Sequence, residues 1–366
     1  MKIRWTVIAV ITLLVISVTM AGCGETSGSQ TKIYVVQENG HILTSRDLGN
    51  TWIDNKPPAG ISPWVVSASN PDAVWAVGTT DTGKSSARIP SGIIMRSSDS
   101  GKSWKTLYSK QGLDFQTITA VNNEVAWAAG GQSQPGIIDQ STSDPVILLT
   151  TDAGKTWTNT APGSLMVHNV RAQSASSSEI DWVIAPARQG DFGVFRTGDG
   201  GKTWTSVFYE KGIVPTRIVA STQDSAWCLA EPQDIGSAFE PNLLLKTVDG
   251  GTHWNKLKVK VNSTQPMMGL AAPTSEIAWL TGSGEDILMT ENGGGTWTQQ
   301  VTDTSQPFIT ISAASRLSAC AIGMKDVILV TSDGGNIWKK HHAVNRKGLL
   351  YSVSMIQYPT KQPSSH

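Results

Sequence analysis

The chain has 366 residues and a balanced charge, with 29 Lys and Arg against 29 Asp and Glu and a pI near 7.0. This balance argues against a nucleic-acid partner, because such proteins usually present a basic face to the phosphate backbone. Only 16% of the residues are charged, 39% are hydrophobic, and Gly is abundant at 35 residues. The composition excludes a disordered chain and indicates a turn-rich, all-β protein.

The N-terminus has the pattern of an export signal. Lys2 and Arg4 precede an apolar run over 5–18, and the run is followed by Met20-Ala21-Gly22-Cys23. Small residues before a Cys resemble a bacterial lipobox, with Met20 where Leu is usual. The resemblance implies a lipoprotein signal peptide over 1–22, a lipidated Cys23, and a flexible tether over 23–31. The alternative is an uncleaved transmembrane anchor, because the run approaches the roughly 18 residues that span a bilayer. In either case we expect the remainder outside the cytoplasm. A lipidated chain would be anchored to the outer face of the cytoplasmic membrane or to the outer membrane of a bacterium.

An eight-residue phrase, Ser/Thr-x-Asp-x-Gly-x-Thr-Trp, recurs seven times after the tether. Its third positions are Asp47, Asp99, Asp152, Asp199, Asp249, Asn292 and Asp333. Its eighth positions are Trp52, Trp104, Trp157, Trp204, Trp254, Trp297 and Trp338. Successive copies are 41 to 53 residues apart, a period typical of solenoids and propellers.

Short apolar runs surround each copy, as in the fifth repeat, where we expect strands over 217–221, 225–230, 242–247 and 253–257. The second strand has its own signature, a Trp at 75, 127, 182, 227 and 279, with Tyr34 and Cys320 in the first and last repeats. Four antiparallel strands in each of seven repeats predict an all-β, seven-bladed β-propeller over 32–358. The strand over 349–356 would complete the first blade and close the ring, leaving a disordered tail over 359–366. Such a closed ring needs no second copy, so we expect a monomer.

The phrase is expected to form the turn between the third and fourth strands. Gly at its fifth position allows a conformation that other residues resist, and Asp accepts backbone N–H bonds. The Trp would pack beneath the hairpin. Cys228 and Cys320 lie in different repeats, and we expect buried thiols in preference to a disulfide. No metal is expected, because zinc spacing and the alternating carboxylates of a calcium loop are both absent from the sequence.

Strand alternation predicts that the long loops after the second strands share one face with the links between blades. Loops on a rigid scaffold are the usual place for binding residues. The candidate binding residues on this face or near the channel are Trp64, Arg88, Arg171, Arg188, Tyr209, Arg217, Phe239 and Arg346.

The repeated phrase resembles the Asp-box, or BNR repeat, of sialidase-like propellers, in which these Asp residues are structural. Seven copies on an exported chain of this size are similar to the photosystem II assembly and stability factor family. That resemblance implies a non-enzymatic scaffold that binds a protein in or at the membrane, with no catalytic residue and no cofactor.

Two enzymatic alternatives remain. Ala87-Arg88-Ile89-Pro90 resembles the Arg motif of sialidases, but it precedes the second copy of the phrase instead of the first. A glycoside hydrolase or glycan-binding propeller of the xyloglucanase type would need two carboxylates across a cleft. The sequence offers Asp139, Asp144, Asp191, Glu231, Asp234, Glu240, Glu285 and Asp286, and singles out no pair.

Overall fold

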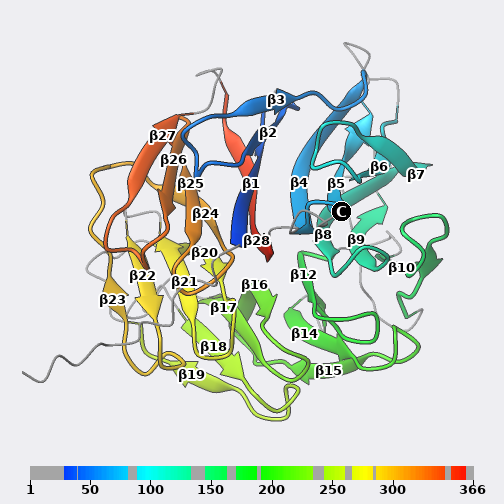
Figure 1. Ribbon diagram of the computed structural model, residues 1–366. Coiled ribbons are helices and arrows are strands. Elements are labelled where there is room, and N and C mark those ends of the chain that lie inside the picture. Colours follow the sequence, from blue (N-terminus) through cyan, green and yellow to red (C-terminus); the bar gives the residue numbers. More distant parts are fainter. Residues whose placement is uncertain are drawn as a thin grey trace, which may run out of the picture.

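The computed structural model describes residues 29–38, 40–80, 89–132, 145–162, 170–187, 191–233, 243–259, 266–282, 286–342 and 348–359. These residues form seven four-stranded sheets arranged in a ring, and every strand pairing is antiparallel (Figure 1). The predicted all-β, seven-bladed propeller is therefore confirmed.

Each blade runs from an innermost first strand to an outermost fourth strand. Blade 1 contains β28 (Leu350–Pro359), β1 (Ser29–Gln37), β2 (Ile42–Ser45) and β3 (Ile53–Asn55). Blade 2 contains β4 (Ile61–Asn70), β5 (Ala73–Thr80), β6 (Ser91–Ser97) and β7 (Lys105–Gln111). Blade 3 contains β8 (Leu113–Ala120), β9 (Ala126–Gln132), β10 (Pro145–Thr150) and β11 (Thr158–Asn159). Blade 4 contains β12 (Ala172–Ala175), β13 (Asp181–Pro186), β14 (Phe192–Thr197) and β15 (Thr205–Phe208). Blade 5 contains β16 (Ile213–Ala220), β17 (Ala226–Pro232), β18 (Leu243–Thr247) and β19 (Asn255–Leu257). Blade 6 contains β20 (Met267–Ala271), β21 (Ala278–Gly282), β22 (Ile287–Thr290) and β23 (Thr298–Gln299). Blade 7 contains β24 (Phe308–Ala313), β25 (Ala319–Gly323), β26 (Val327–Thr331) and β27 (Lys339–His342).

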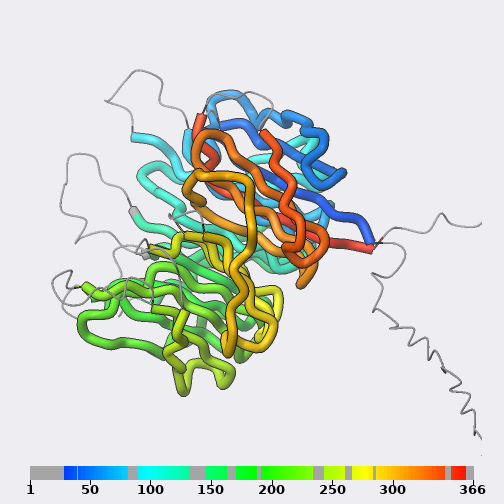
Figure 2. Tube along the Cα trace, turned by 90° about the vertical axis from the view of Figure 1, so that its left-hand side faces the viewer, coloured from blue at the N-terminus to red at the C-terminus, as the bar shows by residue number. Residues whose placement is uncertain are grey.

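The two chain ends close the ring in blade 1, as predicted. β28 pairs with β1 from Ser29 opposite Pro359 to Gln37 opposite Leu350. β1 thus begins three residues before the expected start at Lys32. Figure 2 shows the beginning of β1 and the end of β28 leaving from the same side of the ring. The turns between third and fourth strands lie on this side, because β2 ends level with the beginning of β1.

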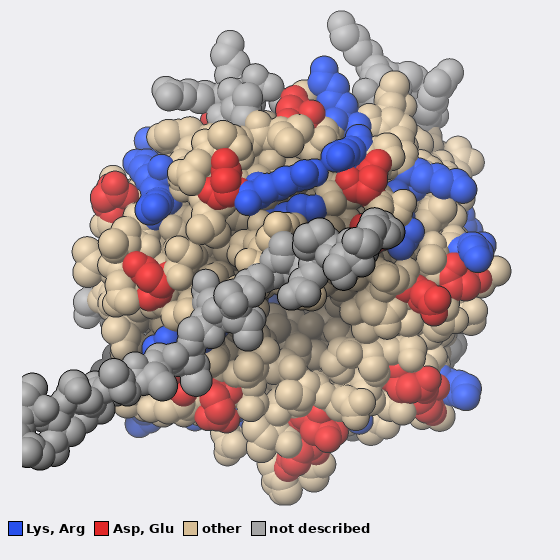
Figure 3. Space-filling model, in the orientation of Figure 1, with Lys and Arg blue, Asp and Glu red and all other residues tan. Residues whose placement is uncertain are grey.

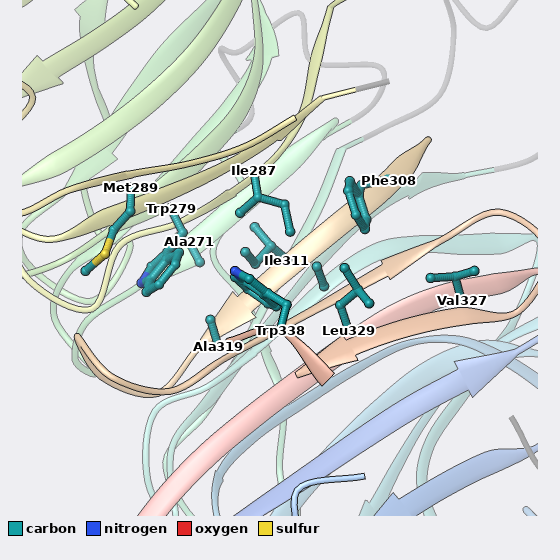
Figure 4. Packing of buried hydrophobic residues seen from close by; sticks show 11 residues of the cluster. Ala271, Trp279, Ile287, Met289, Phe308, Ile311, Ala319, Val327, Leu329 and Trp338 are labelled. Atoms are coloured by element: carbon teal, nitrogen blue, oxygen red, sulfur yellow. The ribbon is translucent and has the colours of Figure 1, made fainter. Parts of the chain in front are cut away.

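The hydrophobic core consists of seven clusters, most of them lying between neighbouring blades. The second strands are covered on both faces, which explains why stretches such as Trp75-Ala76-Val77 are continuously apolar. Figure 4 shows the seam between blades 6 and 7, where Trp279 of β21 lies beside Trp338 and Met289. Both free thiols of the described chain, Cys228 and Cys320, are buried in different blades, and burial raises their pKa.

The two repeated Trp sets meet across the blade seams. The Trp at the eighth phrase position packs edge-to-face on the second-strand Trp of the preceding blade, with ring centroids 5.7 to 6.4 Å apart. The pairs are Trp75–Trp157, Trp127–Trp204, Trp182–Trp254, Trp227–Trp297 and Trp279–Trp338. The phrase Trp thus lies at the seam, where Trp157 packs on Leu148 of its own blade as well as on Trp75 of the preceding one. Edge-to-face pairs contribute about 1 kcal/mol each beyond their buried area.

Hydroxyl groups in the first strands add polar links at four of the seven seams. In each link a first-strand Ser stands opposite the repeated Trp, Tyr or Cys of the second strand. Its hydroxyl oxygen accepts a backbone N–H from the first strand of the next blade, at 2.9 or 3.0 Å. The links are Ser354 to Ala68, Ser67 to Ala120, Ser174 to Ala220, and Ser312 to Met355. Val219 and Ala271 stand at the same position in blades 5 and 6, so the seams that follow them have no such link.

Candidate functional site

The seven repeated turns share one hydrogen-bonding scheme, which uses the Asp carboxylate within the turn. In blade 4, Thr197 Oγ1 donates to Asp199 Oδ1 at 2.9 Å and accepts the N–H of Gly201 at 2.9 Å. The N–H and hydroxyl of Thr203 donate to the two oxygens of Asp199 at 2.9 and 2.7 Å. These two bonds from Thr203 lower the pKa of Asp199 to about 2, although the little burial that it has opposes them. The carboxylate therefore serves as an acceptor and lacks the proton that a general acid must supply.

The scheme tolerates departures from the phrase. In blade 6, Asn292 accepts the N–H of Thr296 at 2.9 Å and donates its own amide N–H to the Thr296 hydroxyl at 2.9 Å. In blade 5, His253 Nδ1 lies 2.7 Å from Asp249 Oδ2 in place of a hydroxyl. Ile337 of blade 7 supplies only its backbone N–H, at 3.0 Å. The backbone bonds are thus common to all seven turns, while the side-chain bond varies.

A β-bulge occurs at the same place in the first strand of six blades. It lies three residues before the first-strand residue that pairs with the second-strand Trp, Tyr or Cys. Each bulge leaves one residue without a partner on the second strand: Tyr351, Trp64, Gln116, Thr216, Met268 and Ile309. Arg171 occupies the position in blade 4, where its N–H donates to Ile184 O, opposite Ala172. Bulges re-aim side chains and are frequent beside functional sites.

These seven residues form a set that we name the channel-mouth ring. The residue before each of them is buried, namely Leu350, Pro63, Phe115, Val170, Pro215, Met267 and Phe308. Every ring residue itself is exposed or half-buried, including Met268 at 37% and Tyr351 at 41%. Because the bulges lie toward the start of the first strands, the ring lies nearer the side opposite the repeated turns. Figure 3 shows the turn side, where the middle of the face is hollowed.

The ring contains an apolar part and a polar part. Met268, Ile309, Tyr351 and Trp64 come from the consecutive blades 6, 7, 1 and 2. Gln116, Arg171 and Thr216 come from blades 3, 4 and 5. Figure 1 shows the corresponding first strands around the centre, with β8, β12 and β16 next to one another.

Two predicted binding residues belong to the ring and are held by defined contacts. Trp64 donates its indole N–H to Phe115 O of the next blade at 2.7 Å. The Arg171 guanidinium lies over the Phe192 ring, 3.8 Å from its centroid. Desolvation lowers the pKa of Arg171, and the negative charge of the nearby Glu231 opposes part of this shift. Stacking occupies a face of the guanidinium and leaves in-plane N–H donors for other partners.

Arg217, the residue after the ring position in blade 5, differs from the other semi-buried arginines. It is half-buried in β16, and the described part of the chain gives it neither a hydrogen bond nor an ion pair. Desolvation lowers its pKa, and within the described residues no acidic side chain opposes this shift. By contrast, Arg196 lies over the Trp182 ring at 5.2 Å and donates to Gln223 O at 3.1 Å.

The remaining predicted residues do not join this set. Tyr209 lies after β15, where its hydroxyl donates to Asp191 Oδ2 at 2.9 Å. Arg88, Arg188, Phe239 and Arg346 lie outside the described residues, as do Cys23 and most of the loops that we expected to be longest.

The carboxylates considered for a hydrolase are only partly described. Asp286 is buried and accepts an N–H from Gln299 at 2.9 Å, while Asp191 and Glu231 have the contacts given above. Asp139, Asp144, Asp234, Glu240 and Glu285 lie outside the described ranges.

The sequence analysis predicted only two of the seven ring residues, Trp64 and Arg171, although the sequence contains a pattern that marks several of the others. A Gly stands three residues after the second-strand Trp or Cys in four blades, as Gly78, Gly130, Gly282 and Gly323. A Cβ added at Gly130 would lie 2.8 Å from Phe115 Cα, immediately before the bulge. The Gly therefore lets the bulged backbone approach, and the pattern Trp-x-x-Gly marks where an unpaired ring residue stands opposite.

Within the described ranges, His, Cys, Asp and Glu side chains nowhere gather in groups of three or more that could hold a metal ion. Those same ranges contain no helix of sufficient length and apolarity to cross a membrane.

Comparison with known proteins gives similarity at the level of the fold. No family model and no curated protein matches the chain. A solved structure described as YCF48 bound to D1 peptide matches with a TM-score of 0.58 and 20% identity, covering 81% of this chain and 88% of that one. YCF48 from Cyanidioschyzon merolae matches with a TM-score of 0.53 and 16% identity over 80% and 88% of the two chains. The GH74 enzyme of Niastella koreensis matches with a TM-score of 0.50 and 12% identity over 92% and 70%.

Proposed function

We propose that this chain is a membrane-tethered, extracytoplasmic binding scaffold that assists the assembly or stability of a membrane or envelope protein complex. The observation that carries the proposal is the channel-mouth ring, which places seven unlike side chains, exposed or half-buried, on an otherwise repetitive framework. A similar fold described as YCF48 bound to D1 peptide supports a protein ligand. Exposed aromatic, Met and Arg side chains are the types enriched at protein interfaces.

The position of the chain end fits this proposal. The N-terminal signal and a lipidated Cys23 would place the molecule outside the cytoplasm, where several acyl chains hold a protein firmly to a membrane. β1 begins at Ser29 on the side of the repeated turns. A tether from Cys23 would therefore attach to the turn side, and the channel-mouth ring would open on the other side, toward a partner.

Glycan hydrolysis, the chemistry of the GH74 neighbour, is the competing function. It requires a carboxylate pair about 5 to 10 Å apart, one member of which is protonated. Asp191 and Asp286 accept hydrogen bonds from Tyr209 and Gln299, and Glu231 lies near Arg171. The bonds that Asp191 and Asp286 accept fit structural roles, so we favour binding over hydrolysis.

The decisive experiment for this proposal is chemical crosslinking in native membranes, followed by purification of the full chain. We expect one membrane or envelope complex to be recovered reproducibly, and a Cys23→Ala chain to leave the membrane fraction. Turnover of a glycoside panel that a single carboxylate substitution abolishes would overturn the proposal. So would recovery of polysaccharide without a protein partner.

A further inference from the structure

We propose that the turn side of blades 7, 1 and 2 docks on a membrane surface through anionic lipid headgroups. The inference rests on the membrane tether of the proposed function and adds a second, electrostatic contact that fixes the orientation of the propeller. Three features carry it: a gap in a repeated set of carboxylates, a cluster of cations at that gap, and the place where the tether joins the fold.

Acidic side chains recur on the turn side of five blades and are replaced in the other two. The residue three positions before the repeated second-strand Trp, Tyr or Cys is an exposed Asp or Glu in blades 2 to 6. These residues are Asp72, Glu124, Glu179, Asp224 and Glu276. Thr31 and Leu317 stand at the same position in the neighbouring blades 1 and 7. The set of carboxylates therefore has one gap, which is two blades wide.

Away from the gap, carboxylates of this set balance cations of the preceding blade. Asp224 of blade 5 lies 3.3 Å from the Arg196 guanidinium of blade 4. Glu276 of blade 6 lies 3.7 Å from Lys246 Nζ of blade 5. Charge on this part of the turn side is thus neutralised within the protein.

Basic side chains gather at the gap. Lys32 of β1 donates from Nζ to Ser100 Oγ in the turn of blade 2 at 2.5 Å. Burial lowers the pKa of Lys32 to about 8, the positive charges of Arg46 and Lys102 add to this shift, and Asp72 opposes it. The three cations therefore lie close enough to repel one another, and Arg46 and Lys102 are exposed.

Further cations extend this cluster into both neighbouring blades. Lys105 follows the repeated turn of blade 2, Lys339 and Lys340 follow that of blade 7, and all three are exposed. Figure 3 shows Lys and Arg concentrated over the upper part of the turn side, where blades 7, 1 and 2 lie in Figure 1. We name Arg46, Lys102, Lys105, Lys339 and Lys340 the basic arc.

The shape and charge of the basic arc fit a lipid surface. Its cations come from separate turns and outer strands on one side of the disc, so they can meet several headgroups at once. Clustered like charges raise the free energy of the folded chain, and a negative surface relieves that repulsion. Each Lys or Arg held near an anionic membrane strengthens its attraction about fivefold.

The tether brings this part of the protein to the membrane. β1 begins at Ser29 in blade 1, which lies at the gap. An extended chain gains at most about 3.6 Å per residue, so the segment from a lipidated Cys23 to Ser29 spans roughly 20 Å at most. The turn side of blade 1 is thereby held close to the range of about 10 Å over which charges act in physiological salt. Docking of the basic arc would leave the channel-mouth ring open on the side away from the membrane.

The test uses the full chain, held by its own anchor in phosphatidylcholine vesicles with or without phosphatidylglycerol, in which a headgroup nitroxide quenches nearby fluorescence. One label is placed at the second phrase position of blade 2 or of blade 5, through Ser98→Cys or Val248→Cys, and both positions are exposed. Cys228 and Cys320 are buried and do not compete for the label. We expect phosphatidylglycerol to raise quenching at position 98 by about threefold or more and at position 248 far less, and high salt to reverse the gain.

Two substitutions at exposed positions link the gain to the basic arc. Arg46→Gln/Lys102→Gln should remove most of the gain at position 98. Lys202→Gln is the matched control and should preserve it, because Lys202 is exposed at the phrase position of Lys102 in blade 4, beyond the gap.

Three results overturn the inference. The first is equal quenching at positions 98 and 248 in phosphatidylglycerol vesicles. The second is a gain at position 98 that survives both high salt and the double substitution. The third is protection of position 98 in native membranes but not in protein-free phosphatidylglycerol vesicles, which would assign the basic arc to an acidic protein.

These outcomes are distinguishable from a failure of the proposed function. Lipid-independent quenching, together with a membrane complex that the Arg46→Gln/Lys102→Gln chain recovers as well as the wild type, would overturn the docking inference alone. Failure of the wild-type chain to stay with phosphatidylcholine vesicles would overturn the tether. The inference would then still require sedimentation with phosphatidylglycerol vesicles that the double substitution reduces, and no sedimentation would overturn it too.

Discussion

The repeated turns and the channel-mouth ring lie on the same seven blades and follow opposite rules. At each turn the same backbone atoms are bonded in the same way, and substitutions such as Asn292 preserve the scheme. At each ring position a bulge recurs, but the side chain differs in every blade. The turns join neighbouring blades, so their residues must be alike. The ring residues are exposed or half-buried and differ from blade to blade, so they can meet a ligand without breaking the repeat.

The largest loss of stability is expected from a substitution at the point where a repeated turn contacts the preceding blade. Gly251 has a φ of +88°, and an added Cβ would lie 2.7 Å from Val207 Cβ. Gly251→Ala should therefore cost about 3 kcal/mol, the sum of backbone strain and a clash at the seam. Gly212 has a φ of +80° with nothing within 4 Å of an added Cβ, so Gly212→Ala should cost only about 1 kcal/mol. Urea unfolding measures both, and equal losses would show that the turn glycine has no seam role.

A smaller change in stability should depend on pH. It is expected at Asp181, which stands directly before the second-strand Trp, where the other blades have an apolar residue. Asp181 is fully buried in β13, accepts from Gln173 Nε2 at 2.8 Å, and has its pKa raised by burial to about 8. The folded chain holds this proton while the unfolded chain releases it near pH 4. The stability that Asp181 contributes is thus complete below pH 4 and lost as pH rises toward 8.

Asp181→Asn removes this titration. We expect the variant to gain about 2 kcal/mol over the wild type at pH 8, because each pKa unit is worth about 1.4 kcal/mol and relaxation absorbs part of the shift. The gain should shrink toward pH 4. Thermal unfolding across this range measures it, and a difference between the two chains that does not change with pH contradicts the account.

The turn carboxylate should matter as an acceptor and not as a charge. Although burial opposes the shift, hydrogen bonds from Ser103 lower the pKa of Asp99 to about 2. Asp99→Ala should cost about 1 to 2 kcal/mol through lost hydrogen bonds. Asp99→Asn should cost less than half of that at pH 7, because Asn292 already fills this position in blade 6. Chemical denaturation ranks the two, and an Asn as costly as Ala would show that the charge is needed.

The smallest change in stability is expected at Arg217, the residue that follows the ring position in blade 5. Arg217→Met removes a half-buried cation that has no bonding partner within the described chain, so stability should rise by about 0.5 to 1 kcal/mol. Arg196→Met is the control and should lose stability, because Arg196 donates to Gln223 O. Differential scanning calorimetry checks the signs, and a loss at Arg217 would indicate a structural role there.

The sequence predicts the fold well because repetition amplifies each local signal. One Asp-x-Gly turn is weak evidence, but seven copies with a Trp at fixed spacing determine blade number, strand order and closure by β28. Partners across the seams were not predictable, since Trp204 and Trp127 meet only through the twist of the sheets. Of the ring, Trp64 was predicted from its place on a link between blades, and Arg171 from its place in an innermost strand near the channel. Thr216 and Gln116 were missed, because their exposure comes from a bulge and not from strand alternation.

The central claim is that the partner meets the channel-mouth ring and not the repeated turns. Site-specific photocrosslinking in native membranes tests it directly, with the photoreactive residue at Met268 of the ring or at Ile337, a turn residue that is 61% exposed. The account predicts one discrete crosslinked protein from position 268 and none from position 337. The same protein crosslinked from position 337, with position 268 silent, would contradict it.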